Sequence, residues 1–232
     1  MAAPPAGGGV TMDTTQAYPL RAALEWLAFA LFAAGWLGYE RYHAARTRRD
    51  PASTRHGRLL ASQEAWVAAM VARRQPILFI QTFRNLGRQT IFFGSITLLG
   101  LGGAFSLLLS GERMRALCRI TCLFGHPSPL LAQLKLLLLV AVLALAFLEF
   151  VWAARALIAA HVYTDGGAGE DEERAAALAR YLADFQLDFR RGLRTAYYGV
   201  ALLAWPFSVE TFLLATVVLT LLLARYDLHP GR

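Results

Sequence analysis

Long apolar runs alternate with basic connecting segments along the chain, and these runs predict its helices. Runs with almost no charge cover about residues 20–39, 90–110 and 134–160. Each has at least the roughly 20 residues that an α-helix needs to cross about 30 Å of hydrocarbon. We therefore expect three transmembrane spans within a single helical membrane domain, residues 20–228, which follows a flexible tail at residues 1–19.

The last apolar stretch, residues 196–224, is longer than one comfortable span, because a straight helix of that length would measure ~44 Å. Pro206 cannot continue a helical hydrogen-bond ladder, and Ser208 is a typical helix N-cap. The pattern therefore predicts a hairpin of two short membrane helices, at about 196–206 and 209–224. The alternative is one kinked and tilted span.

Two connecting segments have apolar positions at helical spacing. In the first, residues 56–75, the apolar face holds Leu60, Trp66, Val67, Met70 and Val71. In the second, residues 170–194, it holds Leu178, Tyr181, Leu182, Phe185 and Phe189. Arginines flank both faces, so we expect two amphipathic helices lying in the membrane interface. The predicted fold class is an all-α integral membrane helical bundle with four to five transmembrane segments and these two interfacial helices.

The composition supports a membrane protein over a soluble domain. The chain is 56% hydrophobic with a mean hydropathy of +0.42, and only 17% of its residues are charged. Soluble domains carry about a quarter charged residues, spread over their surface. The net charge of +7 is better explained by membrane topology and anionic lipid than by nucleic acid, which would leave the apolar runs without a purpose.

The arrangement of basic residues predicts the orientation. If the last stretch is a hairpin, 18 of the 23 Lys and Arg residues fall on one side of the membrane. Basic residues concentrate on the cytoplasmic side of membrane proteins. We therefore expect the N-terminus outside and the Arg-rich connection 41–88 in the cytoplasm.

Polar residues at the inner ends of the predicted spans form one candidate site. They could contact the phosphate of a lipid, another anion or a partner protein, because guanidinium groups match phosphate geometry. The simpler interpretation is that they anchor the helices at the interface. The candidates are Arg84, Asn85, Arg88, Arg155, Arg194, Tyr197 and Tyr198.

Glu149 is a second candidate, because it is the single acidic residue of the third apolar run. A carboxylate within a span is costly, so it is expected to face a partner or a polar cavity. It would bind a proton or a cation there. Alternatively, it is neutral and hydrogen-bonds to a neighbouring helix.

Metal and cofactor sites have little support in the sequence. Cys118, Cys122 and His126 are weak candidates for a metal site, since C-x3-C is not a recognised ligand spacing. No two histidines share a helix at the depth that a b-type haem requires. We expect no metal and no cofactor. No signature of a soluble enzyme occurs, so the sequence disfavours catalysis.

Several stretches resemble a family of bacterial and plant membrane proteins known as domain of unknown function 599. They are QTFRN and IFFGS around the start of the second span, KLLLL to FVWAAR in the third, and RGLRTAYYGVALLAW before the final turn. In order they cover roughly Trp26 to Asp227. The resemblance implies a multi-pass protein of the bacterial inner membrane and carries over no catalytic residue. Glu149 lies outside the shared pattern.

Two functions remain open. In the first, the protein is a structural or accessory subunit that packs against other membrane proteins or against itself, with membrane lipids as further partners and no nucleic acid. The alternative is a small oligomeric transporter or channel for an ion or small anion, using Glu149 and the inner-face arginines. The predicted hairpin of short helices favours this alternative, because interrupted helices form transport sites.

Overall fold

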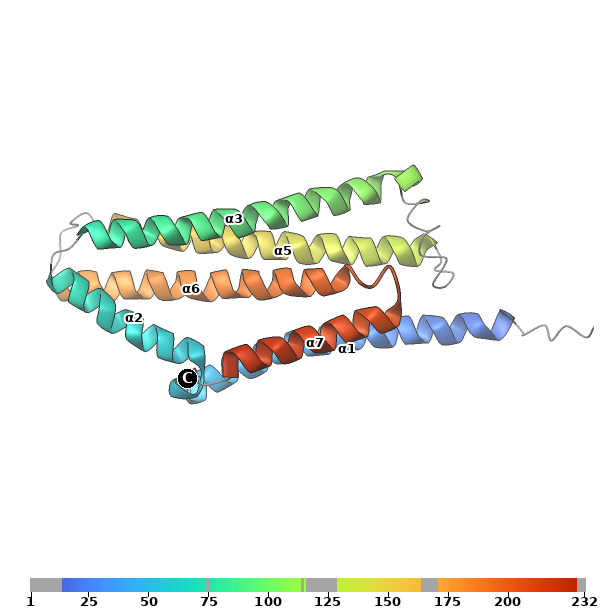
Figure 1. Cartoon of the computed structure of the whole chain (residues 1–232), viewed down its shortest axis with the longest axis horizontal. Coiled ribbons are helices and arrows are strands. Elements are labelled where there is room, and N and C mark those ends of the chain that lie inside the picture. Colours follow the sequence, from blue (N-terminus) through green and yellow to red (C-terminus); the bar gives the residue numbers. More distant parts are fainter. Residues whose placement is uncertain (1–13, 74–75, 114, 116–128, 164–170, 229–232) are drawn as a thin grey trace, which may run out of the picture.

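The computed structural model describes residues 14–73, 76–113, 115, 129–163 and 171–228, and the ordered elements in these ranges are helices. Figure 1 shows their arrangement. In chain order the main elements are α1 (Thr14–Arg49), the short 3₁₀ turn η1 (Pro51–Ser53), α2 (Arg55–Ala72), α3 (Pro76–Leu109), α5 (Pro129–Val162), α6 (Asp171–Leu202) and α7 (Val209–Leu228). The predicted all-α class is confirmed.

The helices form two units that lie side by side. α5 packs along both α3 and α6 to make a three-helix layer, and α1 packs along α7 as a pair beside α6 (Figure 1). α2 crosses one end of the molecule, where it leads from the end of α1 to the start of α3 and packs against α6. We call this end the α2 end, and the end with the α6–α7 turn the turn end.

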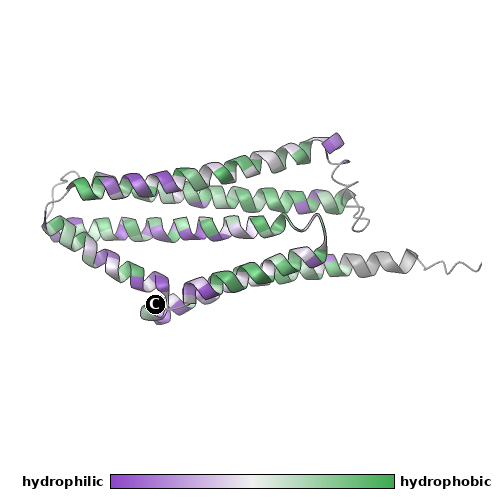
Figure 2. Ribbon diagram, viewed as in Figure 1, coloured by the Kyte–Doolittle hydropathy of each residue, from purple (hydrophilic) through white to green (hydrophobic). Residues whose placement is uncertain are grey.

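Three of the described helices are long and apolar enough to cross a membrane. They are Ile77–Leu109 in α3, Leu130–Val162 in α5 and Val209–Asp227 in α7. Between 11% and 33% of their most apolar windows is buried inside the protein, and Figure 2 shows that hydrophobic residues make up most of α5 and α7 and the second half of α3. Apolar helices that the fold leaves uncovered are expected for a protein that lipid surrounds.

The two amphipathic helices differ from the prediction. Their apolar faces pack against each other and not against the membrane surface: Val67 and Met70 of α2 share one core with Leu182 and Phe185 of α6. The second predicted helix also runs without a break into the predicted span at 196–206, as one helix, α6. With 32 residues, α6 is about 48 Å long and exceeds the hydrocarbon thickness, so its first half can form a protein core beyond the membrane.

The chain turns back between α6 and α7. α6 ends at Leu202, residues 203–207 form turns, and Ser208 Oγ accepts a hydrogen bond from the Thr211 amide at 3.1 Å. This is the N-cap that the sequence predicts, and Pro206 lies within the turn. The final stretch is therefore interrupted, and the alternative of a single kinked span is wrong.

Aromatic side chains fill the space between the two units. Phe32 of α1, Tyr198 of α6 and Phe212 of α7 are almost completely buried. The ring centroid of Phe32 lies 5.7 Å from that of Tyr198 and 5.3 Å from that of Phe212. Large rings thus hold α1 and α7 against α6 across a spacing that small side chains would not bridge.

Candidate functional site

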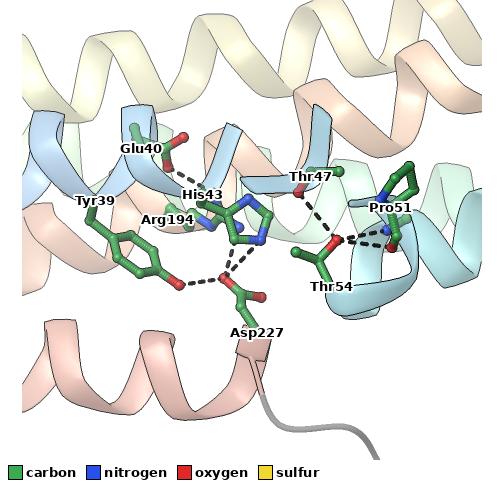
Figure 3. Close-up of polar contacts among 9 residues, drawn as sticks. Tyr39, Glu40, His43, Thr47, Pro51, Thr54, Arg194 and Asp227 are labelled. Atoms are coloured by element: carbon green, nitrogen blue, oxygen red, sulfur yellow. Dashed lines mark hydrogen bonds and ion pairs between the residues drawn. The ribbon is translucent and has the colours of Figure 1, made fainter. Parts of the chain in front are cut away.

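Arg194 is the centre of a buried ionic cluster at the α2 end of the bundle. Its Nη1 donates to Glu40 Oε1 at 3.1 Å, and its Nη2 donates to Asp227 Oδ2 at 2.7 Å. Tyr39 Oη donates to the same Asp227 oxygen at 2.7 Å (Figure 3). Three helices thus meet at one guanidinium group. We call the residues around it the inner cluster: Tyr39, Glu40, His43, Arg194 and Asp227.

Helix geometry explains why these side chains meet. Tyr39, Glu40 and His43 lie within about one turn of α1, and Asp227 stands at the end of α7, which packs along α1. Arg194 is 7% exposed and Asp227 is 4% exposed. Charges buried to this degree are strongly destabilising unless they are paired and hydrogen-bonded. The cluster therefore binds the α1–α7 pair to α6.

The inner cluster contains one buried histidine, His43, and a second one, His56, lies beside it. His43 Nε2 lies 3.8 Å from Asp227 Oδ2 and has no hydrogen-bond partner among the described residues. Burial, together with the nearby Arg194, lowers the pKa of His43 to about 4. Burial and the charge of Arg190 likewise lower the pKa of His56, in the first turn of α2, to about 4. Both rings are therefore neutral at neutral pH.

A tight joint fixes the start of α2 beside this cluster. Thr54 is the N-cap, and its Oγ1 accepts from the Gly57 amide at 3.2 Å and from Thr47 Oγ1 at 3.2 Å. A Cβ atom at Gly57 would lie 2.1 Å from the carbonyl oxygen of Pro51. Only glycine permits this approach, and the resulting joint positions His56 on the buried side of α2.

A second ionic cluster lies at the turn end and joins α1 to α5. Lys135 Nζ lies 2.7 Å from Glu25 Oε1, and Trp205 Nε1 donates to Glu25 Oε2 at 2.6 Å. The Lys135 ammonium also stands over the Trp205 ring, 5.1 Å from its centroid. We call these three residues the outer cluster. Its single acid and single base neutralise each other.

The two clusters frame an apolar layer. On α5 the outer cluster lies at the level of Lys135. The inner cluster lies at the level of Phe150, because the Phe150 ring packs against Gly192, two residues before Arg194 on α6: a Cβ atom at Gly192 would be 3.0 Å from that ring. Fifteen helical residues between these levels correspond to ~22 Å. Charged groups at both edges of a layer of this thickness are typical of a membrane-embedded bundle.

The predicted anion site is not assembled as one group. Arg84, Asn85 and Arg88 are exposed on α3, Arg155 is exposed on α5, and Tyr197 is exposed on α6. In contrast, Arg194 is buried between two carboxylates. Tyr198 is buried too, with its hydroxyl 3.1 Å from Thr220 Oγ1. A role for the exposed residues in lipid or partner contact stays a prediction.

Glu149 faces α6 at the level of the inner cluster. It is half-buried, and the Thr195 side chain lies close to its carboxylate. The second oxygen, Oε2, is buried without a hydrogen-bond partner among the described residues. Glu149 precedes Phe150, so it lies near the edge of the apolar layer, and its function stays a prediction.

The weak metal candidates cannot be placed. Cys118, Cys122 and His126 lie outside the described residues. Within the described ranges, no group of three or more His, Cys, Asp or Glu side chains is arranged to hold a metal ion.

Sequence reasoning missed most of the residues that the structure brings together. Glu25, Glu40 and Asp227 were not candidates, although Glu25 lies within an apolar run and the other two lie directly beyond apolar runs. An isolated acid in or beside an apolar helix requires a partner of opposite charge. Applied to every such acid, this rule would have selected all three.

The comparisons with known proteins assign a family. The family described as "Protein of unknown function, DUF599" matches residues 27–231. No curated protein and no solved structure matches the chain significantly. The matched region includes all helices except the first part of α1, and thus nearly all residues of both ionic clusters. The chain therefore belongs to the DUF599 family of proteins of unknown function.

Proposed function

We propose that this protein is a multi-pass protein of the bacterial inner membrane that acts as a structural or accessory subunit. α1, α3, α5 and α7 supply four spans, and the end of α6 supplies a short fifth one that turns back at residues 203–208. The N-terminus lies outside, and the Arg-rich connection 41–88 lies in the cytoplasm. The protein packs against other membrane proteins or against a second copy of itself.

The distribution of charge supports this orientation. The α2 end carries most of the described arginines: Arg41, Arg46, Arg48, Arg49, Arg55, Arg58, Arg73, Arg84, Arg88, Arg155, Arg174, Arg180, Arg190, Arg191, Arg194 and Arg225. At the turn end, Lys135 is paired with Glu25. The positive-inside rule places the end with more Lys and Arg in the cytoplasm.

One observation supports the subunit function above all: the buried charges of the two clusters pair with one another, and the layer between the two clusters is packed. Its interior is filled by Phe32, Leu139, Tyr198, Leu202 and Phe212, which are all buried. An ion path through one chain requires polar groups along its length. A scaffold requires a packed interior and an outer surface that a partner can bind.

The outer face of α3 offers such a surface. Ser95, Leu99, Gly102 and Ser106 lie along one face of this helix by their spacing. Leu99 is 76% exposed, and a Cβ atom at Gly102 would meet nothing within 4 Å. Small residues on a membrane helix allow a second helix to approach closely. This face is the proposed contact with a partner subunit.

The test is the size of the native assembly. The protein is extracted with its surrounding lipid by a membrane-active polymer, and its mass is measured. We expect an assembly larger than one chain, which Gly102→Trp disrupts. The matched control is Leu221→Trp on α7, where the side chain is 64% exposed and outside the proposed contact. A lone monomer for the unmodified protein contradicts the proposal.

A second candidate function is transport of an ion or a small anion by an oligomer. The unpartnered buried oxygen of Glu149 favours it, because such an oxygen can take up a proton or a cation. Glu149→Gln would then abolish flux in liposomes, whereas Glu64→Gln on the exposed surface of α2 would not. Unchanged flux in the Glu149→Gln variant excludes this function.

A further inference from the structure

A groove of ≈ 300 Å³ runs between α1 and α5 beside the outer cluster. Its walls are almost entirely apolar and include Trp26 and Phe29 of α1, and Leu134, Leu138 and Ala141 of α5. Glu25, Lys135 and Trp205 of the outer cluster also line the groove. It is large enough to hold a flexible hydrocarbon chain.

The groove runs along α5, in the direction that an acyl chain takes in a bilayer. Its lining on α5 extends from Leu131 to Ala141, which are ten helical residues or about 15 Å apart. It begins at Leu131, about one helical turn beyond the Lys135–Glu25 pair, passes that pair and continues into the apolar layer. A lipid chain in a bilayer runs in the same direction, from the headgroup region inward.

Stacked rings form one rigid wall of the groove. The Phe29 and Trp205 rings are parallel within 1° at 5.9 Å, and the Trp205 and Phe212 rings follow at 4.8 Å. The indole of Trp205 is also fixed by its hydrogen bond to Glu25. Because this wall is held by stacking and by a hydrogen bond, the groove cannot close by a simple rotation of one side chain.

The surroundings of the groove identify its occupant. α5 is one of the helices that can span a membrane. Beside the groove, Trp26 is 61% exposed, Leu134 is 44% exposed and Leu137 is 51% exposed. Tryptophan at such a position is typical of the headgroup level, and hydrocarbon is the medium that surrounds the residues below it.

We propose that this groove binds one acyl chain of a membrane phospholipid, whose headgroup lies at the Lys135–Glu25 end. The bound chain contacts α1 and α5 at once, and so joins two helices that otherwise meet through long side chains. The proposal rests on the membrane placement described under the proposed function.

The test uses a phospholipid with a photoreactive diazirine in its acyl chain. The protein is reconstituted in phosphatidylcholine nanodiscs that contain a small fraction of this lipid, then irradiated, and the labelled peptides are mapped. We expect labelling concentrated on the groove residues of α1 and α5, and competition by unlabelled phospholipid. Ala141→Trp fills the groove and reduces this labelling about tenfold, equivalent to roughly 1.4 kcal/mol.

Two further variants make the result specific. Leu148→Trp, at a 45% exposed site on α5 outside the groove, leaves the labelling unchanged. Leu134→Trp narrows the groove from a second position and reduces the labelling as Ala141→Trp does. Both altered side chains of the groove are exposed in the free protein, so folding should be retained. Native mass spectrometry should find one phospholipid retained by the unmodified protein and by Leu148→Trp, and none by Ala141→Trp.

Two outcomes overturn the proposal and differ from each other. Labelling that spreads evenly over exposed residues of α3 and α5, and is unchanged in Ala141→Trp, shows a membrane protein without a lipid site in this groove. The absence of labelling at Ile91 and Leu99, which are exposed on α3, shows instead that the membrane placement itself is wrong.

Discussion

The two ends of the bundle both contain buried charges, but they neutralise these charges with different side chains. At the turn end, one base and one acid neutralise each other, and an indole N–H satisfies the second carboxylate oxygen. At the α2 end, Arg194 contacts two carboxylates, and two neutral histidines lie close by. Both clusters connect α1 to the three-helix layer, but the inner one contains His43 and lies beside His56, two histidines whose pKa values burial lowers to about 4.

This difference indicates separate roles for the two ends. The Lys135–Glu25 pair is closed, since Glu25 also accepts the indole N–H of Trp205, and it acts as a permanent link. At the inner cluster, His43 Nε2 and Nδ1 of the neighbouring His56 lack hydrogen-bond partners among the described residues. It is therefore the end at which the contact between the two units responds to its environment.

Among the single substitutions, replacement of Arg194 by Met should lower the free energy of unfolding most, because it leaves Glu40 and Asp227 without their cation. A buried ion pair that loses one partner destabilises a protein by about 3–5 kcal/mol, and two unpaired acids put this variant near ~5 kcal/mol. Unfolding in lipid nanodiscs, followed by steric trapping, measures the change.

The control for this prediction is Arg191→Met, since Arg191 is exposed on the same helix turn; it should change stability by less than ~0.5 kcal/mol. The double variant Arg194→Met, Asp227→Leu should recover part of the loss, because one unpaired acid disappears with it. Equal stability of Arg194→Met and the unmodified protein would show that the inner cluster does not bind the units together.

Replacement of Lys135 by Met tests the outer cluster in the same way. Glu25 would keep its hydrogen bond to Trp205 and is partly accessible, with 14% of its side chain exposed. The expected loss is therefore smaller, about 3 kcal/mol. Lys135→Met combined with Glu25→Leu should restore most of it. If Arg194→Met and Lys135→Met lower the free energy of unfolding equally, the two ends do not differ in their contribution to stability.

The sequence allowed the helices to be predicted better than their contacts. Apolar runs and the Pro206–Ser208 interruption are local signals, and the turn is found where they place it. The continuity of α6 was missed because its polar first half and apolar second half look like separate helices, although nothing in the residues between them breaks a helix.

The partners of the ionic clusters could not be read from local patterns. Tyr39 and Asp227 are 188 positions apart, and Trp205 and Glu25 are 180 apart. Spacing rules apply within one helix, whereas these contacts depend on which helices lie side by side and at what level. For the same reason the exposed arginines Arg84 and Arg88 were grouped with Arg194, which has the same residue type and an entirely different environment.

Acidification should weaken the inner end selectively. His43 and His56 have pKa values lowered to about 4 in the folded protein, against about 6.5 in the unfolded chain. Between these values the unfolded chain binds protons that the folded protein does not, so stability is complete above pH ~6.5 and falls as the pH approaches 4. The free energy of unfolding falls by up to about 3 kcal/mol per histidine.

Unfolding free energies measured from pH 7.5 to 4 would show this dependence. Replacement of both residues, His43→Gln with His56→Gln, should flatten the curve, and His161→Gln at the exposed end of α5 should not. A curve that keeps its slope in the double variant would assign the pH dependence to other groups. The response of the Lys135→Met protein should parallel that of the unmodified one, since its altered residue belongs to the other end.

The smallest expected change in stability comes from the close contact between Gly192 of α6 and Phe150 of α5, which lies at the level of the inner cluster. A Cβ atom at Gly192 would lie 3.0 Å from the Phe150 ring, whereas one at Gly102 would meet nothing within 4 Å. Gly192→Ala should push α6 away from α5 and displace Arg194, and overpacking of this kind costs about 1–2 kcal/mol. Gly102→Ala should instead stabilise α3 by about 0.5–1 kcal/mol, because alanine favours a helix interior.

The combination with cluster variants locates this effect at one end. Gly192→Ala should be less than additive with Arg194→Met, because the displaced cation is already absent, and additive with Lys135→Met, which acts about 22 Å away along α5. Additivity with both variants would mean that Phe150 yields to the new methyl group without moving α6. The inner cluster would then owe its position to α1 and α7 rather than to the contact between α5 and α6.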